Sequence, residues 1–426
     1  MYYILMHQNT QVAYCKDDKV LKILRKELLP IGTIFKKKQC NLKNWLLKRC
    51  IPKTRTNYIE IKEFLEGHFS NTEQYAFNNY GVSLNDCYWF YEVPSSFHFY
   101  LFKKSKFSSK IPDYKNIKLY NIKEIEDGFL QHVAENKSID ATKINSKLPD
   151  NVTGGNTTKF WTMRNGEFYL VKQNHPSQNK VAEKIIASQI VCDIINNTRH
   201  DLNEKKPDIE TANYFYETGN QPINSCCYSK CFTDENHGIT TYAAIEHTLG
   251  KSMSIEEMIE HINPSSEYLK EFFDFLILFD YLTENKRTKD DINFIINNSS
   301  NRIIRPAPLS DFSNTFDYMD KDYERIYKKD NIGNYINVFE MTPEEQIDYI
   351  ANISWIDNRE LFANFSELQE YFESNADTRQ LTLANLETIC NVINHKLYHI
   401  EKRKYEIAEA EGLLEEFGFG TDEEYY

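Results

Sequence analysis

A long apolar run that leads into a polar loop most constrains how this chain folds. Residues 272–282 are almost entirely apolar, residues 284–293 are polar, and a short strand-like segment then leads to Asp311. The loop ends at Asn293, eighteen positions before Asp311. Amide and carboxylate oxygens are hard ligands that suit Mg²⁺ in phosphate-transfer sites. The pattern therefore indicates a buried element beside a candidate metal site, although Asn and Asp are also common turn residues.

Length and composition indicate a folded protein of two or three domains. The chain has 426 residues, of which 41% are hydrophobic and 14% aromatic, so it can bury substantial cores and is not of a disordered class. The 50 Lys and Arg and the 63 Asp and Glu give a net charge of 50 − 63 = −13. A negative global field disfavours non-specific binding of nucleic acid, so direct contact with nucleic acid is not expected.

Cysteine usage and hydropathy indicate a cytoplasmic protein. Nine Cys are scattered along the chain without a Cys-x-x-Cys pair, which suits a reducing compartment. Their one cluster, Cys226, Cys227 and Cys231, lies in a strand-like segment and is interpreted as small buried hydrophobes rather than zinc ligands. The apolar start of the chain is too short for a signal peptide, and no later run is apolar for about 20 residues. We expect no membrane contact.

The order of patterns divides the chain into successive parts. The expected parts are an N-terminal α+β domain (1–135), a linker (136–150), a strand-rich small lobe (151–236), a helical large lobe (237–420) and an acidic tail (421–426). In the last helical part, Ser254 and Thr342 each precede a Glu at the third following position, which is a capping box. Apolar residues at helical spacing over 386–400 predict a long C-terminal helix.

A glycine turn opens the small lobe. Gly154 and Gly155 are followed by Asn156 and Thr157, and adjacent glycines allow backbone N–H groups to approach phosphate oxygens. The same dipeptide also occurs in hairpin turns that bind nothing. Beyond a hairpin at Asn165-Gly166, Lys172 ends the second strand, where it either meets a nucleotide phosphate or faces solvent.

A helix follows the lysine strand. Apolar residues at helical spacing begin at Val181, and Glu183 on this helix either pairs with Lys172, as in kinases, or lies on the surface without a partner. A strand-rich half with a glycine turn, a lysine and one helix, followed by a helical half with an Asn/Asp pair, is the order of parts in a bilobal kinase. The predicted fold class is therefore α+β.

Several short strings then carry a resemblance to a known family. The N-terminal strings are Leu29-Pro30-Ile31-Gly32, Leu42 to Trp45, Arg49-Cys50-Ile51-Pro52, Arg55 and Ser83-Leu84-Asn85-Asp86-Cys87-Tyr88-Trp89. The later strings are Gly154-Gly155 to Trp161, Tyr169-Leu170-Val171-Lys172, Ile186-Ala187-Ser188, Cys231-Phe232-Thr233, Phe279-Asp280-Tyr281-Leu282 and Ala307-Pro308-Leu309-Ser310-Asp311. Together they resemble the HipA-like kinases, in particular the longer form of low-GC Gram-positive bacteria and their mobile elements.

The resemblance implies a kinase-like fold that binds ATP and Mg²⁺ and phosphorylates Ser or Thr, often as the toxin of a toxin–antitoxin pair. On matching positions, the turn from Gly154 to Thr157 is the phosphate loop, and Lys172 holds the ATP phosphates. Cys231 lies in the hinge, and Asn293 with Asp311 holds Mg²⁺. A protein substrate or a regulatory protein is the implied partner.

The chain departs from the family at the catalytic loop. The family places an Asp, the general base, five residues before the metal-binding Asn, but Thr288 stands at that position here. Asp290 and Asp291 follow too late for the expected reach, so Asp290 is only a candidate substitute base. Glu183 is one residue out of register with the helix Glu of the family, and Lys184 takes its place; one residue is about 100° on a helix.

Two hypotheses follow from these departures. Losing a general base typically lowers the rate about 10²- to 10⁴-fold, whereas nucleotide binding depends on residues that are present. The first hypothesis is a HipA-like Ser/Thr kinase, slow or with a substitute carboxylate. The second is a pseudokinase that acts as a nucleotide-binding or protein-interaction module, for example in phage defence.

Overall fold

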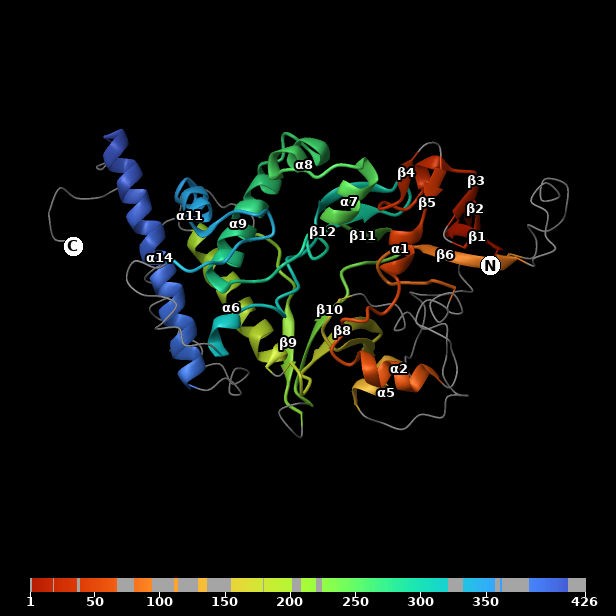
Figure 1. The fold of residues 1–426 in the computed structure, drawn as a ribbon, viewed down its shortest axis with the longest axis horizontal. Helices are drawn as coiled ribbons and strands as arrows, with labels where there is room; N and C mark the ends of the chain where they lie inside the picture. The colour runs from red at the N-terminus through yellow and green to blue at the C-terminus, as the bar shows by residue number, and fades with distance from the viewer. Residues whose placement is uncertain are drawn as a thin grey trace. The chain divides into compact units, whose positions relative to one another are not determined.

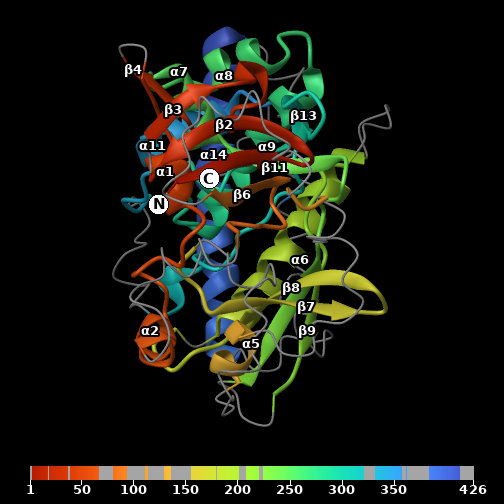
Figure 2. The same ribbon diagram turned by 90° about the vertical axis from the view of Figure 1, so that its right-hand side faces the viewer.

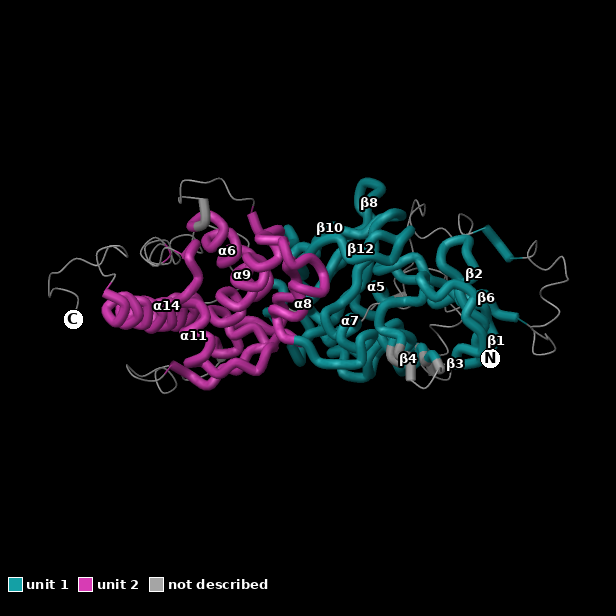
Figure 3. Tube along the Cα trace, turned by 90° about the horizontal axis from the view of Figure 1, so that it is seen from above, with its two compact units in different colours: residues 1–182, 212–253, 289–308 teal, residues 183–211, 254–288, 309–426 magenta. Residues whose placement is uncertain are grey.

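The structure, a computed structural model, forms two compact units, each assembled from three segments of the chain (Figure 3). The first unit contains Met1–Ala182, Ala212–Met253 and Lys289–Pro308, and the second contains Glu183–Thr211, Ser254–Thr288 and Leu309–Tyr426. The described residues are 2–17, 19–36, 39–66, 80–93, 111–113, 129–135, 155–178, 180–200, 208–219, 224–320, 332–356, 361 and 383–412. The expected linker at 136–150 and the tail at 421–426 lie outside the described residues, and the domain boundaries stay predictions.

The N-terminal part of the first unit is a six-stranded sheet with the order β4-β5-β3-β2-β1-β6. Its strands are β1 (Tyr2–His7), β2 (Thr10–Lys16), β3 (Lys19–Ile23), β4 (Ile34–Lys36), β5 (Gln39–Asn41) and β6 (Tyr88–Val93). A short 3₁₀ turn, η1 (Lys26–Leu28), precedes β4. Figure 2 shows β3, β2, β1 and β6 side by side, and β1 pairs antiparallel with both β2 and β6.

Strand β1 is buried on both faces because apolar residues occupy both positions of its two-residue period. Tyr3 and Leu5 belong to one hydrophobic cluster, which includes Trp45 of the short helix α1 (Lys43–Leu47). Ile4 and Met6 belong to a second cluster, which includes Trp161 and Phe168 of the next sheet. The second cluster therefore packs the N-terminal sheet and the following hairpin around one core.

The next sheet of the first unit carries the glycine turn and the lysine strand. Its strands are β7 (Lys159–Arg164), β8 (Glu167–Gln173), β10 (Cys226–Lys230) and β9 (Tyr214–Glu217), in that order and antiparallel. Asn165 and Gly166 both have positive φ, 53° and 80°, as a two-residue hairpin turn requires. Helices α2 (Tyr58–Glu66) and α5 (Phe129–Ala134) share a hydrophobic cluster with β7 and β8.

A small third sheet completes the first unit. It consists of β11 (His237–Thr241), β12 (Asn293–Asn297) and β13 (Arg302–Pro306), in that order. Helix α7 (Tyr242–Leu249) follows β11 directly and begins at Thr241, whose side chain accepts a hydrogen bond from the Ala244 N–H. Among the described residues beyond 240 most are helical as predicted, and the strands of this sheet differ from that prediction.

The second unit is helical (Figure 1). Its elements are α6 (Val181–His200) from Glu183 onward, α8 (Ile255–Ile262), α9 (Glu267–Thr283), η7 (Asp317–Asp320), α11 (Pro343–Ala351) and α14 (Leu383–Glu411). Helix α9 is buried on all sides over its last twelve residues, 272–283, which explains why its sequence is apolar without a polar face. Helices α11 and α14 both pack against α9 (Figure 1).

Helix ends in the second unit follow the sequence signals. Ser254 and Glu257 form a reciprocal capping box at α8, and Thr342 and Glu345 form one at α11. The apolar residues that predict the long C-terminal helix are buried along α14. Strands thus dominate the first unit and helices the second, which confirms the mixed α+β class. No helix in the described part of the chain is long and apolar enough to cross a membrane.

Candidate functional site

The glycine turn lies immediately before β7. Gly155 has φ +88°, a conformation that favours glycine because it has no Cβ. The Lys159 ammonium lies directly over Gly155, where a Cβ would stand. Asn156 is exposed, while Thr157 is buried. Gly154 lies outside the described residues.

Lys172 is buried, with only 3% of its surface exposed. Lys172 lies on β8, opposite Lys159 of the neighbouring strand β7 and opposite Cys227 of β10. Its ammonium lies 5.8 Å from the centre of the Tyr214 ring. The alternative that Lys172 faces solvent is therefore wrong. Directly paired residues project from the same face of a sheet, so Lys159 and Lys172 place two cations on one face beside the turn. Two ammonium groups and the backbone N–H groups of a glycine turn suit the phosphates of ATP.

Glu183 is fully buried in the first turn of α6. The alternative of a surface Glu is therefore wrong. Glu183 belongs to the second unit and Lys172 to the first, so their ion pair stays a prediction. Lys184, the residue in the family position, is also buried and its ammonium lies 3.6 Å from an Asp317 carboxylate oxygen. Within the second unit, α6 is thereby tied to the segment that follows Asp311.

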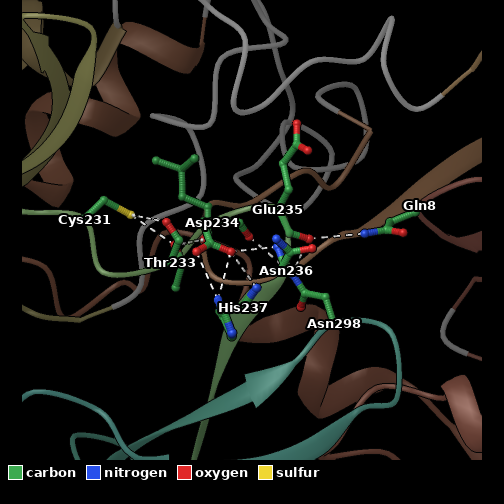
Figure 4. Close-up of polar contacts among 9 residues, drawn as sticks. Gln8, Cys231, Thr233, Asp234, Glu235, Asn236, His237 and Asn298 are labelled. Atoms are coloured by element: carbon green, nitrogen blue, oxygen red, sulfur yellow. Dashed lines mark hydrogen bonds and ion pairs between the residues drawn. The ribbon is translucent and has the colours of Figure 1, made fainter.

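The expected hinge is a loop whose shape is fixed by its own hydrogen bonds (Figure 4). The Cys231 N–H donates to the Phe168 carbonyl at 2.8 Å, and the Cys231 sulfur lies 3.0 Å from the Thr233 hydroxyl. Asp234 accepts from the His237 backbone N–H at 2.8 Å and lies 3.0 Å from its imidazole. Burial raises the pKa of the Cys231 thiol, which keeps it protonated. Cys231 continues β10 into this loop, and its contact with a nucleotide stays a prediction.

Residues that flank strands β1, β6 and β12 contact the same loop. Thr233 donates its hydroxyl to the Leu84 carbonyl at 2.6 Å, and the Ile239 N–H donates to the Asn85 carbonyl at 2.7 Å. The side-chain amides of Asn298 and Gln8 both donate to the Glu235 carbonyl, at 3.1 Å and 3.2 Å (Figure 4). The Ser-Leu-Asn-Asp string is therefore a contact segment for the hinge loop.

Asp311 adopts a left-handed backbone conformation with φ +68°. Such a conformation is uncommon for a residue with a Cβ and needs support from its surroundings. The Arg287 guanidinium donates to the carbonyl of Ser310 at 2.7 Å, and the Asn285 amide donates to the carbonyl of Asp311 at 3.4 Å. The two carbonyls on either side of the Asp311 α-carbon are thus held by the loop after α9.

A buried ion pair supports these contacts. Arg287 and Asp280 lie 2.9 Å apart with side chains 0% and 1% exposed, and Asn285 donates to Asp280 at 3.1 Å. Burial raises the pKa of Asp280, and Arg287 opposes that rise. Tyr335 donates its hydroxyl to the Asn285 carbonyl at 2.6 Å. The sequence predicted no role for Asp280, although its signal was a charged residue directly after the apolar stretch 275–279 of α9.

Asp290 is engaged in contacts that hold the start of α7. Its carboxylate pairs with Lys48 and accepts from the Thr241 hydroxyl at 3.1 Å. The neighbouring Lys289 carbonyl accepts from the Ala243 N–H at 3.1 Å. These contacts favour a structural role, and the role of Asp290 as a base stays a prediction.

Asn293 is the first residue of β12. Its amide donates to the Asp291 carbonyl at 3.2 Å, and its carbonyl accepts from the Ala307 N–H at 2.9 Å. Asn293 belongs to the first unit and Asp311 to the second, so the shared metal ion stays a prediction. Their amide and carboxylate oxygens suit Mg²⁺. Among the described residues no group of three or more His, Cys, Asp and Glu side chains is placed to hold a metal ion.

The chain is similar to solved structures of other proteins. The chain is similar to the proinflammatory kinase CtkA of Helicobacter pylori, with a TM-score of 0.42 and 16% identity over 60% of this chain and 93% of CtkA. It is also similar to HipA of Shewanella oneidensis, solved with HipB and operator DNA, with a TM-score of 0.49 and 11% identity over 94% of this chain and 99% of HipA. No family model and no curated protein matches the chain. Both TM-scores lie below 0.5, so the proposals below depend on the residues of this chain.

Proposed function

We propose that this chain is a HipA-like serine/threonine protein kinase that binds ATP and Mg²⁺. The observation that carries the proposal is the burial of Lys172 beside Lys159 and the Gly155 turn. The two ammonium groups and the backbone N–H groups of the turn match the negative charge of nucleotide phosphates. The acidic chain disfavours nucleic acid as the source of those phosphates.

In this proposal each candidate residue has a defined role. Lys172 and the turn from Gly154 to Thr157 hold the phosphates, while Glu183 orients Lys172. Cys231 lies at the adenine end, and Asn293 and Asp311 hold Mg²⁺, which neutralises charge that develops on the transferred phosphoryl group. The substrate is a hydroxyl of a protein, and a toxin–antitoxin setting follows the resemblance. Cysteine usage favours the cytoplasm, and phage defence is an alternative setting.

A pseudokinase is the second candidate, and one observation favours it. Thr288 stands where the family has its base, and Asp290 is held by Lys48 and Thr241. A carboxylate that already accepts from a cation and a hydroxyl is turned toward those partners. In this candidate the chain binds a nucleotide and signals to a protein partner without transferring phosphate.

Intact mass after incubation with Mg-ATP separates the two candidates. A kinase adds phosphate to itself or to an offered protein, and Asp311→Ala abolishes that transfer because the metal ligand is lost. Asp290→Ala reduces the rate about 10²-fold or more if Asp290 is the base and leaves it unchanged otherwise. Nucleotide binding without phosphate in any sample contradicts the kinase proposal and favours the pseudokinase.

A further inference from the structure

The N-terminal region contacts the candidate phosphate loop through one short segment. Residues Thr54, Arg55 and Thr56 lie about 100 positions before the glycine turn in sequence, yet they make hydrogen bonds to it. All of these residues belong to the first unit. The contacts are made mostly to the backbone of the turn, which indicates that the segment determines its shape.

Thr56 makes the shortest contacts to the turn backbone. Its backbone N–H and its hydroxyl both donate to the Asn156 carbonyl, at 2.7 Å and 2.8 Å. The Thr54 hydroxyl donates to the side-chain carbonyl of Asn156 at 2.6 Å. Asn156 is thus held by three hydrogen bonds from one segment, although its own side chain is exposed.

Arg55 extends the contact on either side of Asn156. Its guanidinium is buried, with 2% of the residue exposed, and donates to the Gly155 carbonyl at 3.3 Å and to the Lys159 carbonyl at 3.4 Å. A buried arginine that donates to backbone carbonyls at both ends of a turn restricts how that turn can move.

The geometry of the peptide bond determines in which direction the N–H groups of the turn point. In a trans peptide the carbonyl of one residue and the N–H of the next point in opposite directions. Because the Gly155 and Asn156 carbonyls point toward Arg55 and Thr56, the N–H groups of Asn156 and Thr157 point away from them. Two successive N–H groups beside a residue with positive φ form a concave site that suits an anion.

We propose that Arg55 and Thr56 are positioning residues for the phosphates of ATP: they orient the N–H groups of Asn156 and Thr157 beside Lys159 and Lys172. The inference deepens the proposed function, on which it rests, and assigns a role to part of the N-terminal region. It predicts that the segment acts on the phosphate end of the nucleotide and leaves the nucleoside end unaffected.

The test compares Mg-ATP with adenosine, which has no phosphate. Thr56→Val removes only the hydroxyl and keeps the size of the side chain, so it is chosen as the main variant, with Thr54→Val as a second conservative one. Thr10→Val, on an exposed position of β2, is the matched control. Arg55→Gln is paired with Arg302→Gln on exposed β13. Dissociation constants are measured by titration calorimetry on the full chain, and thermal midpoints report folding.

We expect Thr56→Val to weaken Mg-ATP binding about 5- to 10-fold, as the loss of one hydrogen bond implies, and to leave adenosine binding within about twofold of the wild type. Equal Mg-ATP affinity in Thr56→Val, Thr54→Val and the wild type would overturn the inference while the proposed function stands. Parallel losses of Mg-ATP and adenosine affinity would also overturn it, because they indicate a general structural role. A wild-type chain that binds no Mg-ATP would overturn the proposed function and this inference together.

Discussion

Asp280 and Arg287 are the residues that most directly stabilise the conformation of Asp311. Their ion pair is fully buried. Arg287 donates a hydrogen bond to the Ser310 carbonyl, and Asn285 donates one to the Asp311 carbonyl. Sequence reasoning found Asp311 because its residue type suits a metal. It did not find the support, since nothing in the spacing of Asp280 and Arg287 reveals that both side chains point inward.

Arg287→Met should destabilise the second unit strongly. It leaves Asp280 buried without its cation, which typically costs about 3–5 kcal/mol. Urea denaturation measures the change, with Arg302→Met on exposed β13 as the control. A variant as stable as the control would show that Arg287 does not stabilise the buried carboxylate.

The same variant should become relatively more stable as the pH falls. Burial already raises the pKa of Asp280, and Arg287 opposes that rise, so its removal raises the pKa further. A carboxyl whose pKa is higher in the folded state binds more protons there, and stability is therefore lost as the pH rises through that pKa. We expect the difference from the wild type in unfolding free energy to be smaller at pH 5 than at pH 7. An equal or larger difference at pH 5 contradicts this.

At the level of elements, local signals predicted much of the fold. The Asn165-Gly166 hairpin, both capping boxes and the long helix α14 were predicted because each depends on residues close in sequence. The hydrogen bonds from residues 54–56 to the glycine turn were not predictable, because the two segments are about 100 positions apart in the sequence. The burial of Lys172 was missed for a similar reason, since its cover comes from distant strands.

Helix α11 offers a prediction about such a local signal. Thr342→Ala removes the side-chain acceptor for the Glu345 N–H, whereas the backbone N–H of residue 342 still donates to the Glu345 carboxylate. The expected loss of stability is about 1 kcal/mol, measured by thermal unfolding. Thr10→Ala, at an exposed position of a strand, should change it by less than about 0.5 kcal/mol. Equal effects of the two changes would argue against the capping contact.

At the level of the molecule, the first unit joins three sheets from segments far apart in the chain. Strand β1 contributes Ile4 and Met6 to a core shared with Trp161 and Phe168, and Leu84 and Gln8, which lie beside strands of the N-terminal sheet, contact the hinge loop. The N-terminal region is therefore part of the structural unit that carries the candidate nucleotide site. The sequence resemblance covered this region but gave no reason for its presence.

This shared core predicts that Ile4→Ala weakens the nucleotide-site sheet as well as its own. Truncating a fully buried Ile typically costs about 2–5 kcal/mol. Hydrogen exchange should rise in β7 and β8 as well as in β1, whereas Ile59→Ala, at a side chain with 68% exposure, should change neither. Exchange that rises in the N-terminal sheet alone contradicts a common core.

The central claim is that Lys172 and the glycine turn bind a nucleotide, and a thermal shift with Mg-ATP tests it most directly. A ligand at about 100 times its dissociation constant stabilises a protein by about 2.7 kcal/mol. We expect Mg-ATP to raise the thermal midpoint of the wild type and of Lys230→Met, whose lysine is exposed on β10. We expect little or no rise for Lys172→Met. A wild-type midpoint that Mg-ATP does not change, or an equal rise in Lys172→Met, would contradict nucleotide binding at Lys172.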